Sequence, residues 1–308
     1  MPTQQQQPSG LGLAPRLVLA ASITALCGLG FASCSAPDAA SPSRSPTSAS
    51  ASASASASAM QNARNLNDPE LKDLAMQLVS SAENSTLDWR AQFAYIEDIG
   101  DGRGYTAGII GFCSGTGDML ELVESYTHAR PSNPLAPYLD ALRAVNGTDS
   151  HAGLDNAHDG GFVAAWQQAA TDPAFARAQE AERDRVYFNP AVAQAQADGL
   201  GALGQFAYYD AIVMHGPGSE ELSFGGIRKA AITAATPPAE GGDEAEYLTA
   251  FLNARATAMR TEEAHSDTSR VDTAQRIFLE EGNLTLSLPL RWAVYGDDFA
   301  ITEFANAN

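Results

Sequence analysis

Cysteine is scarce in this chain of 308 residues, which contains three, and two of them, Cys27 and Cys34, fall within the first 34 positions. Only Cys113 lies beyond them, so no internal disulfide can form there and no cysteine-based metal site is available. The five histidines show no metal-ligand spacing. We therefore expect no metal and no cofactor, and a core of about 250 residues that is held together by packing.

Basic residues are also few. The chain has 18 lysines and arginines and 37 acidic residues, which gives a formal net charge of −19. Such a field repels the phosphates of nucleic acids and anionic lipid headgroups, and it attracts cations, including cationic polymers. The composition thus argues against a nucleic-acid partner. Solubility alone accounts for the charge equally well.

Long apolar runs are confined to the beginning of the chain, where Arg16 is the only charge before the run from Leu17 to Phe31. This run is too short for a comfortable transmembrane helix and suits the core of a signal peptide. It ends in Phe-Ala-Ser-Cys at Cys34, which approximates a bacterial lipobox. We expect residues 1–34 to be a signal peptide of lipoprotein type. The protein is then secreted and anchored to the cell membrane through lipidated Cys34, or released after ordinary cleavage.

A stretch rich in serine, alanine and proline follows, with an Ala-Ser repeat from Ala49 to Ala59. It has almost no large apolar residues, so it cannot bury enough surface to fold. Residues 35–62 are therefore predicted to be a disordered tether. Residues 63–308 remain for a folded domain of two lobes around a cleft.

The first helix of that domain is well signalled by Asp68 or Asn67 as its cap and by Pro69 in its first turn. Apolar residues at helical spacing follow, and the stripe runs to Glu83. Next comes the densest glycine region of the chain, residues 99–112. Its glycines and β-branched residues favour a small antiparallel sheet or hairpin.

Helical spacing dominates the sequence after Gly115. The segment 190–215 is apolar on most sides, which is typical of a long buried central helix. The fold class is therefore α+β, mainly α. The pattern predicts helices over residues 118–129, 134–145, 175–186, 190–215, 224–235, 244–264 and 269–281.

Two carboxyl groups in this region suit general acid and base chemistry. Glu83 falls at a helix end beside an apolar stripe, which suits an acid that must stay protonated. Asp101 lies on a glycine-rich turn, where we expect it to be exposed to water as a base. Spacing alone does not single out this pair, because an acidic chain offers many such pairs.

Several longer segments of the domain carry a recognisable pattern, namely 78–85, 95–106, 111–118, 182–188, 204–210, 215–218, 223–228 and 267–272. They resemble the family 46 chitosanases, a family of glycoside hydrolases, and the resemblance runs from Leu66 to the C-terminus. It implies a lysozyme-like, two-lobed fold whose catalytic domain is residues 63–308. The region from Asp155 to Phe162 looks longer and richer in glycine than expected for the family.

The resemblance also implies an activity, namely endo-acting, inverting hydrolysis of β-1,4-linked glucosamine in chitosan. The family's general acid falls on Glu83 and its base on Asp101. Thr106 matches the residue that helps to hold the attacking water. The implied partner is a cationic polysaccharide, the membrane is contacted only through the lipid anchor, and we expect a monomer.

Supporting residues follow from the same resemblance. Arg103 and Asp118 match residues that contact sugar, and Arg270 matches an arginine beside the acid, in a network with Asp210 and Arg255. Each also has a plain structural interpretation. Asp118 could favour a helix start through the dipole, and Arg270 with Asp210 could be an ordinary buried ion pair.

Two other functions stay open. The same two carboxyl groups would serve a lysozyme-type hydrolase of N-acetylated polysaccharide. A lipoprotein that binds chitosan oligosaccharides without cleaving them is the alternative from a different class. Cys113, among apolar residues, is expected to be an inert buried thiol rather than a nucleophile.

Overall fold

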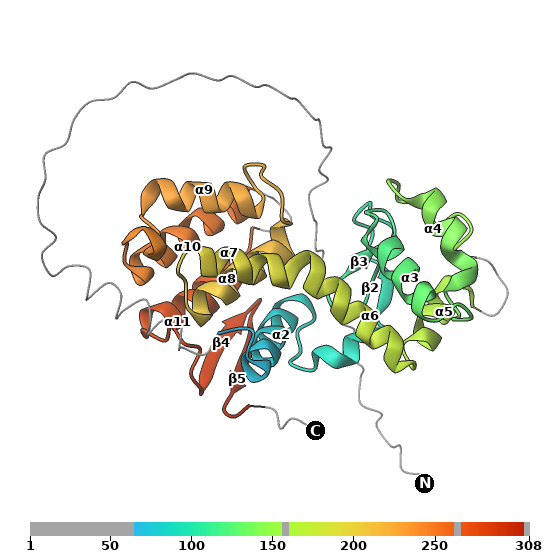
Figure 1. Ribbon diagram of the computed structural model, residues 1–308, viewed down its shortest axis with the longest axis horizontal. Coiled ribbons are helices and arrows are strands. Elements are labelled where there is room, and N and C mark those ends of the chain that lie inside the picture. The colour runs from blue at the N-terminus through green and yellow to red at the C-terminus, as the bar shows by residue number, and fades with distance from the viewer. Residues whose placement is uncertain (1–64, 156–159, 262–265, 305–308) are drawn as a thin grey trace, which may run out of the picture. The chain divides into compact units, whose positions relative to one another are not determined.

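The computed structural model describes residues 65–155, 160–261 and 266–304 (Figure 1). Helices predominate, and the strands form one sheet of three and one of two, so the predicted class, α+β and mainly α, is confirmed. None of the described helices is both long and apolar enough to cross a membrane. The predicted signal peptide, tether and lipidated Cys34 lie outside the described residues.

The chain divides into two compact units, which are described here one at a time. The first comprises Phe93–Gln179, and the second comprises the described residues of 65–92 and 180–304. The chain leaves the second unit inside the 3-10 segment η1 (Trp89–Ala94) and returns to it inside helix α6 (Pro173–Arg183). The second unit is therefore assembled from two separate stretches of sequence.

The first unit contains the predicted antiparallel sheet, with strands β1 (Ile96–Asp98), β2 (Tyr105–Ala107) and β3 (Phe112–Cys113) in that order. Gly104 precedes β2 with a φ of +73°, and a Cβ built on it would lie 2.3 Å from Ser114 Oγ. Only glycine fits this position, because Ser114 Oγ must come close enough to accept a hydrogen bond from Tyr105 N at 2.9 Å.

Helices make up the rest of the first unit. Helix α3 (Asp118–Ala129) has the predicted limits, whereas the predicted helix over 134–145 divides into a 3-10 turn, η2 (Ala136–Tyr138), and α4 (Leu139–Val145). Helix α5 (Gly161–Ala169) was not predicted. It buries Phe162 and Trp166 completely, although the glycines before it resemble a loop.

The second unit begins with α2 (Pro69–Glu83), as predicted. The Asp68 carboxylate caps it by accepting from the backbone N–H groups of Glu70 and Leu71. Its apolar stripe is buried along the whole helix. The helix therefore has a fixed inner face, and Glu83 is its last residue.

The long central helix predicted over 190–215 is wrong, because two helices occupy this segment, α7 (Asn189–Ala197) and α8 (Ala202–His215). Gly199 lies between them with a φ of +80°, and a Cβ there would meet Ala239 N at 2.7 Å. The turn thus needs glycine and ends α7. Helix α8 alone is buried on nearly every side.

Further helices complete the second unit in the predicted order. Two of the predicted helices change type along their length. Helix α6 continues into a π-helical turn, η3 (Asp184–Phe188), and a second π-helical turn, η6 (Val271–Gln275), precedes α11 (Arg276–Glu280). The prediction missed a hairpin of β4 (Leu290–Val294) and β5 (Asp297–Ile301), which buries Trp292. The remaining bounds are α9 (Phe224–Ala234), η4 (Pro238–Glu240) and α10 (Glu244–Thr261).

Candidate active site

Glu83 occupies the C-terminal end of α2, and its side chain is 11 % exposed. The preceding residues Ser80, Ser81 and Ala82 are buried. Ser81 Oγ accepts a hydrogen bond from Trp292 Nε1 of β4 at 3.0 Å, which fixes the end of α2 against the C-terminal hairpin. The Glu83 carboxyl is thus a largely shielded group on a rigid element.

Arg270, directly before η6, is the partner of Glu83. Its Nη1 donates to Glu83 Oε1 at 2.5 Å. Its Nε and Nη2 donate to Asp210 Oδ1 at 2.9 and 2.6 Å, and the guanidinium is 4 % exposed. One buried arginine therefore bridges two carboxyl groups.

Asp210 of α8 is the centre of the network. Besides Arg270, it accepts from Arg255 Nη1 of α10 at 2.6 Å and from Gln275 Nε2 at 2.6 Å. Burial raises the pKa of Asp210, but the positive charges of Arg270 and Arg255 outweigh burial and hold that pKa at about 2. The structure thus brings together Glu83, Arg270, Asp210 and Arg255.

Tyr295 also belongs to this cluster, and the sequence analysis missed it. It lies in the turn between β4 and β5 with a φ of +52°, and its backbone N–H donates to Ser269 Oγ at 2.9 Å. Burial raises the pKa of its phenol, Arg270 lowers it and Glu83 raises it. The phenol is therefore within the electrostatic field of Glu83, a placement that follows from the unpredicted hairpin.

Asp101 belongs to the first unit, in the turn between β1 and β2, and its environment corrects one prediction. We expected a carboxylate exposed to water, but its side chain is 0 % exposed. Arg103 covers it: the backbone N–H donates to Oδ1 at 3.0 Å, and Nε and Nη2 donate to Oδ2 at 2.7 and 2.5 Å. A glycine-rich turn lets the arginine fold back over a carboxylate two residues away.

Arg103 is consequently engaged with Asp101, and its own side chain is 13 % exposed. Burial lowers its pKa, but Cys113, Asp101 and Asp118 raise it above the usual range. The guanidinium is thus a permanent cation beside a fixed carboxylate.

Thr106 and Asp118 both contact Cys113 of β3. Thr106 of β2 is buried, with Oγ1 3.5 Å from Cys113 Sγ. Asp118 begins α3, and its Oδ1 accepts from Cys113 N at 3.0 Å, Met119 N at 3.0 Å and Thr116 Oγ1 at 2.6 Å. Burial raises the pKa of Asp118, whereas these hydrogen bonds lower it. Asp118 therefore lies in the first turn of its helix, where the helix dipole favours a negative charge, and it secures β3 through Cys113 N.

The candidate residues thus form two clusters, one in each unit. The first unit holds Asp101, Arg103, Thr106 and Asp118, and the second holds Glu83, Arg270, Asp210 and Arg255. Among the described residues, no group of three or more His, Cys, Asp or Glu side chains could hold a metal ion.

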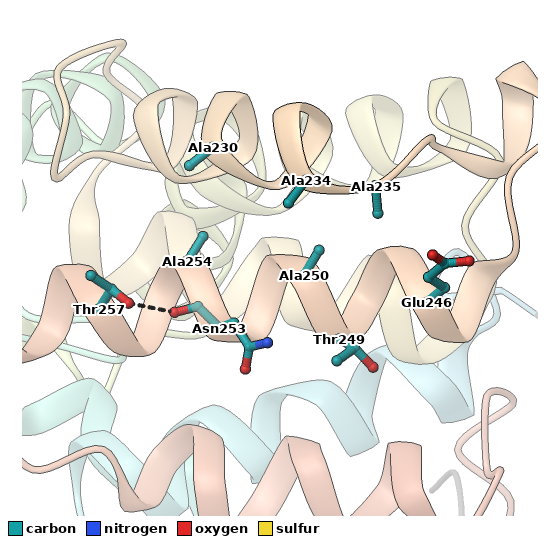
Figure 2. Close-up of a pocket in the computed structure, with 9 residues that line it drawn as sticks. All are labelled: Ala230, Ala234, Ala235, Glu246, Thr249, Ala250, Asn253, Ala254 and Thr257. Atoms are coloured by element: carbon teal, nitrogen blue, oxygen red, sulfur yellow. Dashed lines mark hydrogen bonds between the residues drawn. The ribbon is translucent and has the colours of Figure 1, made fainter.

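The surface of the second unit also has a groove of about 410 Å³ between α9 and α10, which Figure 2 shows. Alanines line both walls, and Glu246 is the only carboxylate among its lining residues. Thr257 Oγ1 donates to the backbone carbonyl of Asn253, so it is already paired (Figure 2). A single carboxylate with no partner cannot perform the two-carboxyl chemistry, and no residue of either cluster lines this groove.

Comparison with known proteins identifies the family of the chain. The sequence model of glycosyl hydrolase family 46 matches residues 77–290, which include the candidate residues of both clusters but not Tyr295. A chitosanase of Streptomyces sp. (strain N174) is 66 % identical over 236 residues, 77 % of this chain and 84 % of the relative. A chitosanase of Bacillus subtilis (strain 168) is 36 % identical over 237 residues, 74 % and 83 % of the two chains.

Solved structures of chitosanases are also similar to this chain. A co-crystal structure of chitosanase OU01 with substrate has a TM-score of 0.74 at 62 % identity, and the match covers 77 % of this chain and 99 % of that one. A complex of the Gynuella sunshinyii chitosanase with chitotetraose has a TM-score of 0.69 at 33 % identity, with 76 % and 98 % covered. By its sequence and by its fold, the chain belongs to glycosyl hydrolase family 46.

Proposed function

We propose that this protein is an endo-acting, inverting chitosanase in which Glu83 is the general acid and Asp101 the general base. The observation that carries the proposal is the environment of the Glu83 carboxyl. Its carboxyl is shielded and fixed by one arginine, and that arginine is also bound by Asp210. Asp210 shares the positive charge of Arg270, so the cation does not act on Glu83 alone.

The contacts of Glu83 suit proton donation. Among the described residues, the hydrogen bond that Arg270 donates to this carboxyl falls on Oε1. Oε2 is then the oxygen that carries the proton to the leaving glycosidic oxygen. Arg270 holds the carboxyl in one orientation, which matters because proton transfer requires hydrogen-bond distance to the leaving group.

Asp101 accepts a proton from a water molecule whose oxygen attacks the anomeric carbon on the face opposite the leaving group, and Thr106 helps to hold that water. Arg103 covers Asp101 in this structure, so the arginine must turn away from Oδ2 before water can reach the carboxylate. A sugar that binds Arg103 supplies a reason for that movement, which gives Arg103 its role in substrate binding.

The charge of the protein fits a cationic substrate. With a formal charge of −19 the chain attracts a polymer of protonated amines. The Oδ1 atom of Asp118 is occupied by three hydrogen bonds. Its Oδ2 is therefore the atom that we assign to a glucosamine amine.

We further propose export and anchoring through lipidated Cys34, with residues 35–62 as a tether and the enzyme as a monomer. The apolar run before Cys34 and the serine- and alanine-rich stretch after it support this location. Mass spectrometry of the exported N-terminus tests it. A diacylated cysteine supports the anchor, and an unmodified terminus at another residue contradicts it.

Proton NMR of chitosan hydrolysis tests the main proposal. We expect the α-anomer of the new reducing ends to appear first and the viscosity of the polymer to fall early, because inversion of a β-linkage yields α and endo-action cuts internal bonds. Initial β-anomer contradicts the inverting mechanism. Constant viscosity with tight binding indicates a binding protein instead.

A series of chitosans of graded acetylation tests the remaining alternative. We expect the rate to fall as acetylation rises, because each acetyl group removes a cationic amine that an acidic protein attracts. A rate that rises with acetylation favours the lysozyme-type hydrolase.

A further inference from the structure

Thr106 and Cys113 face each other across two neighbouring strands of the first unit. They are direct partners in the register of β2 and β3, so their side chains lie on the same face of the sheet. Thr106 Oγ1 and Cys113 Sγ are 3.5 Å apart, and both side chains are buried. Either atom of this pair could be the donor, and the direction of the hydrogen bond matters.

A thiol has a single proton to donate, and this decides the direction of the hydrogen bond between Thr106 and Cys113. Cys113 Sγ lies 3.2 Å from the backbone oxygen of Gly111, which can only accept. Burial raises the pKa of the Cys113 thiol to about 11, although Arg103 lowers it, so the thiol keeps its proton at neutral pH. That single proton is directed to Gly111 O, and Thr106 must therefore donate its own proton to the sulfur.

The Thr106 hydroxyl is then left with its lone pairs. It can accept a hydrogen bond from water but has no proton to donate to it. A water molecule that gives one hydrogen to Thr106 and the other to Asp101 has a free lone pair for the anomeric carbon. If Thr106 donated to the water instead, that hydrogen bond would take one of the two lone pairs of the water and make its oxygen a weaker nucleophile.

We propose that Cys113 is a positioning residue for hydrolysis, because it binds the Thr106 hydroxyl proton and so makes Thr106 an acceptor for the attacking water. This inference rests on the proposed function, specifically on the role of Thr106. In the reaction, the water oxygen bonds to the anomeric carbon while the glycosidic bond breaks. Asp101 takes a water proton and Glu83 supplies one to the leaving oxygen, while the protons of Thr106 and Cys113 stay in place.

The surroundings of the pair fix this arrangement. Gly111 has a φ of +74°, and a Cβ built on it would lie 3.2 Å from Thr106 Cγ2, so the methyl group rests against the glycine. Cys113 N donates to Asp118 Oδ1, which holds the backbone of the cysteine. Arg103 lowers the pKa of the Cys113 thiol and Asp118 and Asp101 raise it, so the sulfur lies among the candidate residues of this unit.

Replacement of the thiol tests the proposal in the full-length protein, with kcat and KM measured on a glucosamine hexamer. We expect Cys113→Ala to lower kcat about 10-fold, the effect of one hydrogen bond, with little change in KM. Cys113→Ser should recover most of this loss, because a hydroxyl can also accept from Thr106 and donate to Gly111 O. Thermal unfolding of both variants separates the loss of turnover from a loss of stability.

A double-mutant cycle with Thr106→Val gives the decisive comparison. We expect Thr106→Val/Cys113→Ala to be no slower than Thr106→Val alone, because the thiol acts only through that hydroxyl. Additive losses would show that Cys113 contributes packing and would overturn the proposal. So would a Cys113→Ala enzyme with normal kcat, or a Cys113→Ser enzyme as slow as Cys113→Ala.

The same variants distinguish this inference from the function on which it rests. If Thr106→Val turns over normally, both the role of Thr106 and the role of Cys113 are overturned. If Thr106→Val is slow and Cys113→Ala is normal, only the role of Cys113 is lost. Infrared difference spectra against Cys113→Ala isolate the S–H band, and we expect it to shift in Thr106→Val because hydrogen bonds in a chain polarise one another. An unchanged band would contradict the contact.

Discussion

Arg270 Nη1 lies 2.5 Å from Glu83 Oε1, although 187 positions of sequence separate the two residues. The arginine also holds Asp210, which is buried completely between its cationic neighbours. The environment of the proposed acid is therefore set by a chain of charges, Glu83, Arg270, Asp210 and Arg255, and not by burial alone.

Glu83→Gln removes the proposed proton donor while it keeps an oxygen that can accept from Arg270. We expect hydrolysis of chitosan to fall by about 10²–10⁴-fold, the usual contribution of a general acid, with oligomer binding retained. Release of reducing ends and calorimetric titration with a glucosamine hexamer measure the two quantities. Glu70→Gln, on the exposed first turn of the same helix, is the control and should turn over normally. Turnover near the normal rate in Glu83→Gln would remove Glu83 from the mechanism.

Asp210→Asn tests the ionisation of the buried network. The pKa of Asp210 in the folded protein is about 2, below its usual value near 3.8. The ionised carboxylate therefore stabilises the fold above pH 4, and this stabilisation is lost as the pH falls towards 2. We expect the free energy of unfolding to depend less on pH between 4 and 2 in Asp210→Asn, and to be lower at pH 6 because two buried arginines lose their counter-charge. Urea unfolding at several pH values measures both.

Asp140→Asn is the matched control, since the Asp140 side chain is 98 % exposed. Its unfolding free energy should follow that of the unchanged protein at every pH. An Asp210→Asn variant with the same acid dependence as the unchanged protein would show that Asp210 does not titrate as described.

Arg103→Ala tests whether this arginine serves both Asp101 and the substrate. We expect KM for a glucosamine oligomer to rise and kcat to change less, because the sugar contact is lost while Asp101 becomes accessible. Stability should fall by about 1–3 kcal/mol, since Asp101 loses charge-assisted hydrogen bonds. Arg143→Ala removes an exposed arginine paired with Glu124 in the same unit and should leave KM unchanged. An unaltered KM in Arg103→Ala would exclude the sugar contact.

Gly104→Ala tests the turn that carries Asp101. The new Cβ would meet Ser114 Oγ at 2.3 Å, and the φ of +73° is unfavourable for alanine. Gly102→Ala carries a similar φ of +80° but meets nothing within 4 Å, so it separates backbone strain from collision. We expect about 1 kcal/mol of destabilisation for Gly102→Ala and at least about 2 kcal/mol for Gly104→Ala. Equal melting temperatures for the two variants would contradict the close contact with Ser114.

Local signals predicted the elements that bear the candidate residues. The cap at Asp68 and the apolar stripe after it placed Glu83 at a helix end, and the glycines around Asp101 indicated a turn between short strands. These features depend on neighbours in sequence. The limits of α3 followed for the same reason.

Features that depend on distant partners were missed. The break between α7 and α8 is set by Gly199, whose backbone approaches Ala239, and periodicity alone does not reveal that approach. The Asp101 carboxylate is shielded by the Arg103 side chain, which could equally have pointed to solvent. The place of Tyr295 near Glu83 requires the hairpin of β4 and β5, which no helical or glycine signal announced.

The second unit is built from two separate stretches of the chain, and this has a consequence for biosynthesis. Helix α2, with Glu83, is translated long before Asp210, Arg255 and Arg270, the residues that surround its carboxyl. A nascent chain that has emerged only as far as α6 therefore carries its acid without the arginine that orients it. We expect the hydrolase to acquire activity only when synthesis is nearly complete, which keeps an unfinished copy inert.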